Sequence, residues 1–336
     1  MNRQRVAWTI VLPSLLLLLL ASIAAGLCVG EVCFTPLEAA RLFTSPGEDA
    51  VTFVLLRLRL PRVLLGCAVG GALGLSGAIL QGVFRNPLVE PYTLGISGGA
   101  SVGVSLAIVL SLRAAWGGLT LPLAGFAGAL LTVALVYGLG TRRGGARVES
   151  LLLTGVMISF ISSSLVMLLM ATAKSEDLHG IIFWIMGALN ETDANLIRLV
   201  GVASLLSLLI ACFHAPALNA MRLGAEPARQ LGVNVGRHVR ALFLLSSILT
   251  GACVSVAGLI GFVGLIIPRL VLRAVGNDYR ALLPASFLGG AAFLVLSDII
   301  ARAIIAPLEL PIGVITGITG GVIFILISRA SRKERP

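Results

Sequence analysis

Residues 62–84, RVLLGCAVGGALGLSGAILQGVF, decide the fold class of this chain. No charged residue follows Arg62 until Arg85, and a helix of this length crosses a hydrocarbon core about 30 Å thick. Since lipid offers no hydrogen-bond partners to the backbone, the run must be a helix. Glycines recur along it at helical spacing, which allows close helix packing or, alternatively, a gating hinge; they are Gly66, Gly70, Gly74 and Gly77.

Similar apolar runs continue on both sides of this stretch. The 336 residues are 57% hydrophobic and 12% charged, with a mean hydropathy of +1.03. A soluble domain carries about 25% charged residues. We therefore predict an all-α polytopic membrane protein, with a single transmembrane domain over residues 1–336. Ten spans are expected, the other nine at about 6–29, 93–111, 119–140, 149–171, 194–213, 239–259, 261–275, 281–301 and 312–328.

The charge pattern gives this layout a direction. The net charge is +10, and most of the 25 lysines and arginines fall on the side that holds both termini. By the positive-inside rule that side is cytoplasmic. The run at 6–29 is longer than the apolar core of a signal peptide, so we expect an uncleaved first helix. No basic run with interleaved aromatic residues indicates nucleic-acid binding.

Three regions between the spans have distinct patterns. Residues 30–57 form the longest predicted outer loop. Residues 172–193, also outside, contain an apolar stretch too short to span, which predicts a short re-entrant or interfacial helix. Residues 257–268 are rich in glycine, which predicts a tight turn or close packing before a short eighth span.

Residues suited to metal binding are few. The five cysteines form no CxxC pair and the three histidines are scattered, so we expect no metal site. Cys28 and Cys33 lie near the outer end of the first span, either as free thiols or as a disulfide.

The chain shows no energy source of its own. A phosphate-binding loop needs a lysine after a glycine, and neither Lys174 nor Lys333 follows one. Glu149 lies at an inner helix end, and the i,i+4 spacing of Asp298 and Arg302 predicts a structural ion pair. With so few buried carboxylates, the pattern favours a permease driven by a partner over a self-contained secondary carrier of a small solute.

An amphipathic inner segment, LNAMRLGAEPARQLGVN at residues 218–234, is where such a partner would dock. Asn219 is a candidate N-cap of a first short helix that ends at Gly224. Pro227 suits the first turn of a second short helix, which Gly232 closes. Two short helices would make a compact docking knob; the alternative is an ordinary surface loop.

Motifs run in a fixed order through the chain: RLPR (59–62), GAILQG (77–82), RNPL (85–88), PYTLGISGGA (91–100), LG (223–224) with ARQLG (228–232), GFVGLIIP (261–268), LLP (282–284), DIIAR (298–302) and ELPIGV (309–314). Taken together, they resemble the FecCD family of ATP-binding-cassette importer permeases, which take up iron–siderophore complexes, haem and cobalamin. Each motif alone is weak, but the ordered series is specific.

The resemblance implies a type II importer permease fold with ten helices per subunit. The subunit would work as a homodimer in the bacterial inner membrane, in contact with lipid and with the substrate path between the two copies. Two cytoplasmic ATPase subunits, which hold ATP and Mg, would dock on the inner segment, and a periplasmic binding protein would deliver the substrate. This chain would bind no cofactor and catalyse no reaction.

The functional positions of the family map onto three groups of residues. ATPase docking maps to Leu218, Arg222, Leu223, Gly224, Glu226, Ala228, Arg229, Gln230, Leu231 and Gly232. The translocation path maps to Asn86, Leu88, Glu149, Thr154, Gly155, Met157, Ser159, Ser162 and Ser163. The alternative for the serines is that each bonds the backbone of its own helix. Binding-protein docking maps to Arg59, Arg62 and Arg302, because arginine offers a bidentate fork to a carboxylate. Alternatively, these arginines anchor helix ends.

Two positions depart from the family pattern. Arg269 stands where the family usually has histidine after the proline, and Gly320-Gly321-Val322 stands where many members have Gly-Ala-Pro. Neither lies in the docking segment, so the overall prediction stands. For the substrate, we expect a ferric siderophore first and cobalamin or haem next.

Overall fold

A computed structural model describes residues 2–30, 34–35, 37–38, 41–42, 50–112, 117–142, 145–146, 148–191, 193–305 and 308–333. All ten predicted apolar runs are helical, so the all-α prediction is confirmed. They are α1 (Asn2–Cys28), α4 (Leu60–Phe84), α5 (Ile96–Val109), α7 (Thr120–Gly140), α8 (Val148–Thr172), α10 (Ala194–Arg222), α12 (Val235–Ala257), α13 (Val263–Val275), α14 (Tyr279–Ala303) and α15 (Ile312–Lys333).

Seven helical stretches in the described residues are long and apolar enough to cross a membrane. They are α1, α7, α8, α10, α12, α14 and the continuous helix over Val51–Phe84. The remaining three runs are α5, α13 and α15; α5 and α13 have 14 and 13 residues, and the apolar part of α15 is Ile312–Ile327. Ten spans is therefore an approximate count.

The predicted outer loop at 30–57 is too long at its C-terminal end. Helix α3 (Ala50–Phe53) and a π-helical turn η1 (Val54–Arg59) lead into α4 without a break, because Pro61 occupies a first-turn position that tolerates proline. Shorter elements complete the chain: a 3₁₀ turn η2 (Pro91–Leu94), the two-residue strands β1 (Thr141–Arg142) and β2 (Gly145–Ala146), α9 (Ser175–Met186) and α11 (Ala225–Gln230).

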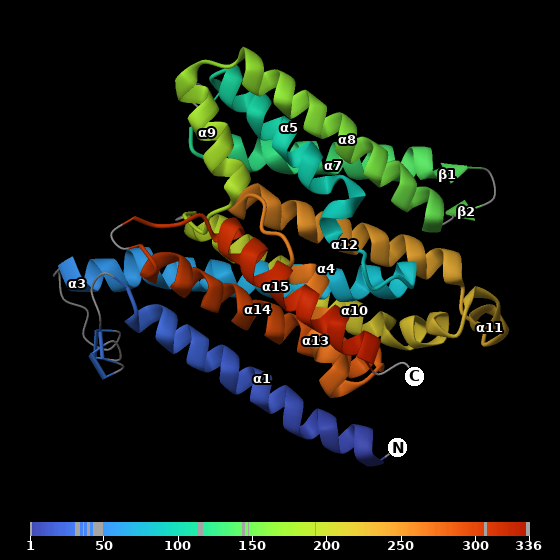
Figure 1. The fold of residues 1–336 in the computed structure, drawn as a ribbon. Helices are drawn as coiled ribbons and strands as arrows, with labels where there is room; N and C mark the ends of the chain where they lie inside the picture. The colour runs from blue at the N-terminus through green and yellow to red at the C-terminus, as the bar shows by residue number, and fades with distance from the viewer. Residues whose placement is uncertain are drawn as a thin grey trace.

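Helix α4 is the centre of the bundle, between α10, α12, α13 and α14 (Figure 1). Its glycines confirm the close-packing prediction. A Cβ at Gly70 or Gly74 would overlap backbone carbonyls of α14, and one at Gly77 would overlap the backbone of Gly264 in α13. Helices of this kind approach closely because small residues leave room for the neighbouring backbone.

The two ends of the bundle carry different elements. Both chain termini and α11 lie at one end, whereas α3 and α9 lie at the opposite end (Figure 1). Helix α9 is the short helix expected within 172–193. Cys33 lies outside the described residues, so the choice between free thiols and a Cys28–Cys33 disulfide stays untested.

The glycine-rich region at 257–268 forms the tight turn between α12 and α13. Gly258 has φ +66° and Phe262 has φ +69°, a left-handed conformation that is uncommon for a residue with a side chain. Two side chains from the α4–α5 connection support the turn. Glu90 Oε1 accepts a hydrogen bond from Phe262 N at 2.5 Å, and Tyr92 OH accepts one from Ile260 N at 3.1 Å.

Candidate functional site

The inner segment 218–234 contains one short helix, not two. Helix α10 continues through Pro216 to Arg222, so the predicted first helix is the last part of α10. Asn219 is accordingly not an N-cap. Its side chain joins α10 to the start of α14: Nδ2 donates to Asp278 Oδ1 at 2.7 Å, and Oδ1 accepts from Tyr279 N at 3.0 Å.

Two glycines set the limits of α11. Gly224 has φ +129° and ψ +163°, a region open essentially to glycine alone, so the chain can turn sharply after α10. Gly232 has φ +81° and ends α11, as predicted, with its N–H bonded to Arg229 O at 2.9 Å. Asn234 then caps α12 by accepting from Arg237 N at 3.1 Å.

The exposed surface of this segment is formed by two leucines around an ion pair. Leu223 and Leu231 are 69% and 65% exposed, and between them Arg229 Nη1 lies 3.1 Å from Glu226 Oε2. Of the other predicted docking residues, Arg222, Gln230 and Gly232 are exposed and Gly224 is half-buried. Leu218 and Ala228 are fully buried, so they can only hold the segment in place.

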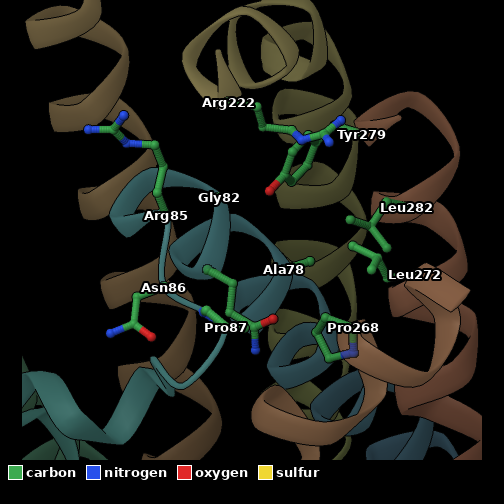
Figure 2. A pocket seen from close by; sticks show the side chains of 11 residues that line it. Ala78, Gly82, Arg85, Asn86, Pro87, Arg222, Pro268, Leu272, Tyr279 and Leu282 are labelled. Atoms are coloured by element: carbon green, nitrogen blue, oxygen red, sulfur yellow. The ribbon is translucent and has the colours of Figure 1, made fainter. Parts of the chain in front are cut away.

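A cavity of about 250 Å³ lies beside this segment (Figure 2). Arg222 from the end of α10 and Tyr279 from α14 line one side, and the connection after α4 lines the other with Arg85 and Asn86. Asn86 Oδ1 accepts from Leu88 N at 2.9 Å, which leaves the Leu88 side chain 56% exposed. Asn86, one of the predicted path residues, thus lines the same cavity as Arg222 at the end of α10.

The other predicted path residues lie on α8 and divide into two sets. Glu149, Met157 and Ser163 are exposed, and Thr154 is half-buried. Gly155 and Ser162 are buried against η2 and α5. Ser159 is half-buried, and its hydroxyl donates to Gly155 O at 3.0 Å. Only Glu149, Met157 and Ser163 are exposed, and nothing shows a solute beside them, so the path assignment stays a prediction.

A second cavity, of about 410 Å³, lies between α5, α8 and α9. Three of the six methionines of the chain line it, together with Ser163 and two serines of α5. The sequence prediction named Ser163 but missed Ser97, Ser101, Met167, Met170 and Met186. Ser163, Met167 and Met170 follow helical spacing, a signal that could have extended the predicted set along α8.

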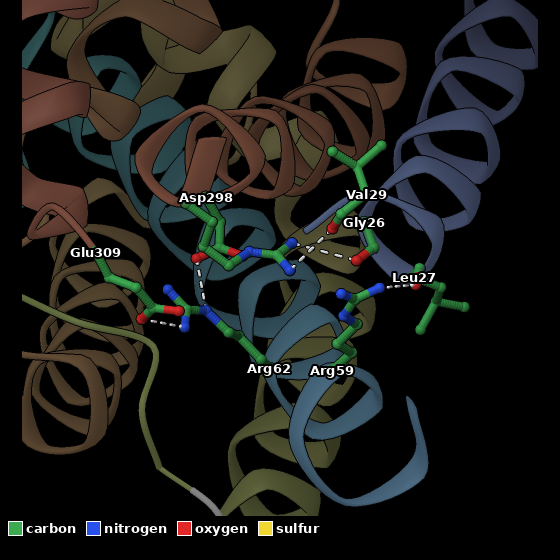
Figure 3. A network of polar contacts seen from close by, with 8 residues as sticks. Gly26, Leu27, Val29, Arg59, Arg62, Asp298 and Glu309 are labelled. Atoms are coloured by element: carbon green, nitrogen blue, oxygen red, sulfur yellow. Dashed lines mark hydrogen bonds and ion pairs between the residues drawn. The ribbon is translucent and has the colours of Figure 1, made fainter. Parts of the chain in front are cut away.

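The three outer arginines are engaged within the chain (Figure 3). Arg59 is 6% exposed; its Nη1 donates to Leu27 O at 3.0 Å, and its guanidinium lies over the Phe34 ring at 4.7 Å. Arg302 Nη2 donates to Gly26 O at 3.2 Å. These contacts join α1 to η1 and α14, as the helix-end anchor alternative expected.

Asp298 is the centre of the outer cluster. Arg302 Nε lies 3.0 Å from Asp298 Oδ2, which confirms the predicted i,i+4 ion pair. Arg62 Nε donates to the other oxygen, Oδ1, at 2.8 Å, and Arg62 Nη1 donates to Glu309 Oε2 at 2.7 Å (Figure 3). Two arginines and two carboxylates from α4, α14 and the segment before α15 therefore form one network.

The model of the FecCD transport family matches residues 16–330 of this chain. The chain belongs to the FecCD transport family. The hemin transport system permease protein of Yersinia pestis is 37% identical over 322 residues, 95% of this chain and 96% of that protein. The vitamin B12 import system permease protein of Citrobacter koseri is 37% identical over 333 residues, 99% of this chain and 97% of that protein.

A solved structure supports the same assignment. An ABC transporter described as of the metal-chelate type, in an inward-facing conformation, has a TM-score of 0.83 and 30% sequence identity, covering 96% of this chain and 99% of that one. As a FecCD member, this chain is a polytopic permease subunit of an ABC transporter. It is not itself an enzyme.

Proposed function

We propose that two copies of this chain form the membrane channel of an importer in the bacterial inner membrane, with both termini in the cytoplasm. Two ATPase subunits would bind inside and a periplasmic binding protein outside. The observation that carries the proposal is α11: an exposed short helix, flanked by the exposed Leu223 and Leu231, at the same end as both termini in a chain without a phosphate-binding loop.

The contacts around α11 suggest how a movement of the ATPase subunits would be transmitted to the helix bundle. Closure of ATP- and Mg-loaded ATPases would move α11, which is bounded by Gly224 and Gly232. The end of α10 would follow, and it is linked to α14 by Asn219 and by the Arg222 guanidinium, which donates to Asn277 O. Since α14 packs against α4 through glycines, the motion would reach the centre of the bundle as a unit.

For the cargo we infer a metal chelate with a large apolar face, haem or cobalamin before a ferric siderophore. This reverses the order expected from the sequence. The relatives named above carry hemin and vitamin B12 in their names. The cavity between α5, α8 and α9 also has a mainly apolar wall with three methionines, whose flexible side chains adapt to irregular apolar surfaces.

The docking proposal is tested by removing the exposed ion pair. Replacing Glu226 and Arg229 together with alanine should weaken co-purification of the ATPase subunits about tenfold, because both side chains point to solvent and only a partner would lose contacts. A matched control removes one charge of each sign at the opposite end, at Lys174 and Glu176, and should have no effect. Unchanged co-purification of the inner double variant would count against docking there.

A further inference from the structure

Arg62 is held by two carboxylates that differ in burial. Asp298 is 2% exposed and lies within α14, whereas Glu309 is 49% exposed and lies in the segment just before α15. Both distances from the guanidinium are short, 2.8 Å to Asp298 and 2.7 Å to Glu309. The same cation therefore has one fixed ligand and one ligand at the surface.

Asp298 cannot leave the cluster without leaving charges unpaired. Its two oxygens contact Arg62 and Arg302, one each, at a site closed to solvent. Removing one partner of a buried ion pair is strongly unfavourable, because the remaining charge has neither water nor a counter-ion. Asp298 is thus a permanent, buried member of the cluster.

Glu309 is in the opposite situation. An ion pair with an exposed partner contributes little to stability, since water solvates the carboxylate when it leaves. The backbone around it is held independently: Leu310 N donates to Ala301 O at 3.2 Å, and Ile312 N donates to Gly187 O at 3.1 Å. The side chain of Glu309 can therefore rotate away from Arg62 while its segment stays in place.

We propose that Glu309 is an exchangeable ion-pair partner of Arg62. In the undocked permease the Glu309 carboxylate pairs with Arg62, and on docking a carboxylate of the binding protein takes its place. This inference rests on the proposed function, because it needs a binding protein at the outer arginines. With Glu309 in place, the cluster of Arg62, Arg302, Asp298 and Glu309 is neutral. When the Glu309 side chain rotates away, the remaining cluster of Arg62, Arg302 and Asp298 has a net charge of about +1, and one edge of the Arg62 guanidinium becomes free to bind a partner.

The exchange makes Glu309 a specificity-determining residue. A partner without an acidic side chain facing Arg62 cannot replace Glu309. The Arg62–Glu309 ion pair then stays in place, and the partner meets a cluster with no net charge. A partner with one forms a charge-assisted hydrogen bond that docking shields from water, where such bonds are stronger. Because Glu309 competes with the partner carboxylate for Arg62, the permease discriminates against partners without that carboxylate, and its affinity for the correct binding protein is lower than it would be without Glu309.

The test measures, at low salt, how tightly the assembled transporter in nanodiscs binds the periplasmic binding protein that delivers its substrate. Glu309→Gln should bind about two- to fivefold more tightly, because the competitor is removed. Glu309→Asp keeps the charge but shortens the side chain, and should shift affinity in the same direction. Glu176→Gln is the matched control: it removes an exposed carboxylate from the same end, one without an ion pair in the described residues, and should change nothing.

Arg62→Gln separates this inference from the docking proposal. If Arg62→Gln loses binding and Glu309→Gln binds more tightly, the result supports both docking at Arg62 and the exchange of Glu309. Loss in Arg62→Gln with unchanged or weaker binding in Glu309→Gln keeps the docking site and overturns the exchange. Equal tightening in Glu176→Gln would reduce the effect to long-range charge and also overturn it. Unchanged binding in Arg62→Gln would reject docking at Arg62 and the exchange together.

Discussion

Glu90 shows how one side chain can fix a junction between two helices. Its carboxylate accepts the N–H of Phe262, the residue whose left-handed backbone opens α13. Without that acceptor, the N–H of Phe262 would lose its hydrogen bond, and an unsatisfied donor inside a protein is unfavourable. Beside it, Tyr92 holds Ile260 in the same turn. The α4–α5 connection thus determines the position of a turn about 170 residues away.

At this residue we predict that acceptor geometry matters more than charge. Glu90→Leu should lower the free energy of unfolding by about 1–3 kcal/mol, the penalty for an unsatisfied buried group. Glu90→Gln keeps an acceptor oxygen and should cost about half as much or less. Thermal unfolding in detergent measures both variants. Equal losses for the two would show that the bond to Phe262 is not the reason for the effect.

Helix packing gives a prediction at the scale of elements. Gly77→Ala would place a methyl group against the Gly264 backbone, and overpacking of this kind costs about 1–3 kcal/mol. Gly201 in α10 has no atom within 4 Å of an added Cβ, so Gly201→Ala should be neutral or slightly stabilising. The measurement is the melting temperature of each purified variant. A similar loss for both would contradict the contact between α4 and α13.

The helices were predictable because apolar length alone defines a membrane helix. Their ends were less so: α10 extends past the apolar run to Arg222, because its last turn is held by Asn219 bonds to α14. Asp298–Arg302 was predictable from local spacing. The contacts of Arg62 with Asp298 and Glu309 were not, since they join residues 236 and 247 positions apart.

The break between two helices within the inner segment 218–234 was predictable in position, but the shape of the segment was not. Its two glycines and its amphipathic sequence marked the region, and the left-handed φ values at Gly224 and Gly232 agree with that reasoning. Sequence could not tell that Leu218 and Ala228 face the core while Leu223 and Leu231 face outward. Burial depends on how α10, α11 and α12 pack together, and no local pattern encodes it.

At the scale of the whole molecule, the bundle separates two surfaces with different chemistry. The end that holds both termini carries α11 with its exposed ion pair, flanked by the exposed Leu223 and Leu231 (Figure 1). The opposite end, where α3 leads into α4 (Figure 1), carries the network of Arg62, Asp298, Arg302 and Glu309. Helix α14 connects them, with Asp278 at its first turn and Asp298 near its last. A permease driven from one side and loaded from the other needs such a connection.

Uptake by reconstituted vesicles tests the central claim most directly. The chain is inserted in vesicles with or without its ATPase subunits, ATP is enclosed, and the binding protein is added outside with haem or cyanocobalamin. We predict that chelate accumulates only when the ATPase subunits, ATP and the binding protein are all present. Accumulation by this chain alone would identify a self-contained carrier and contradict the account.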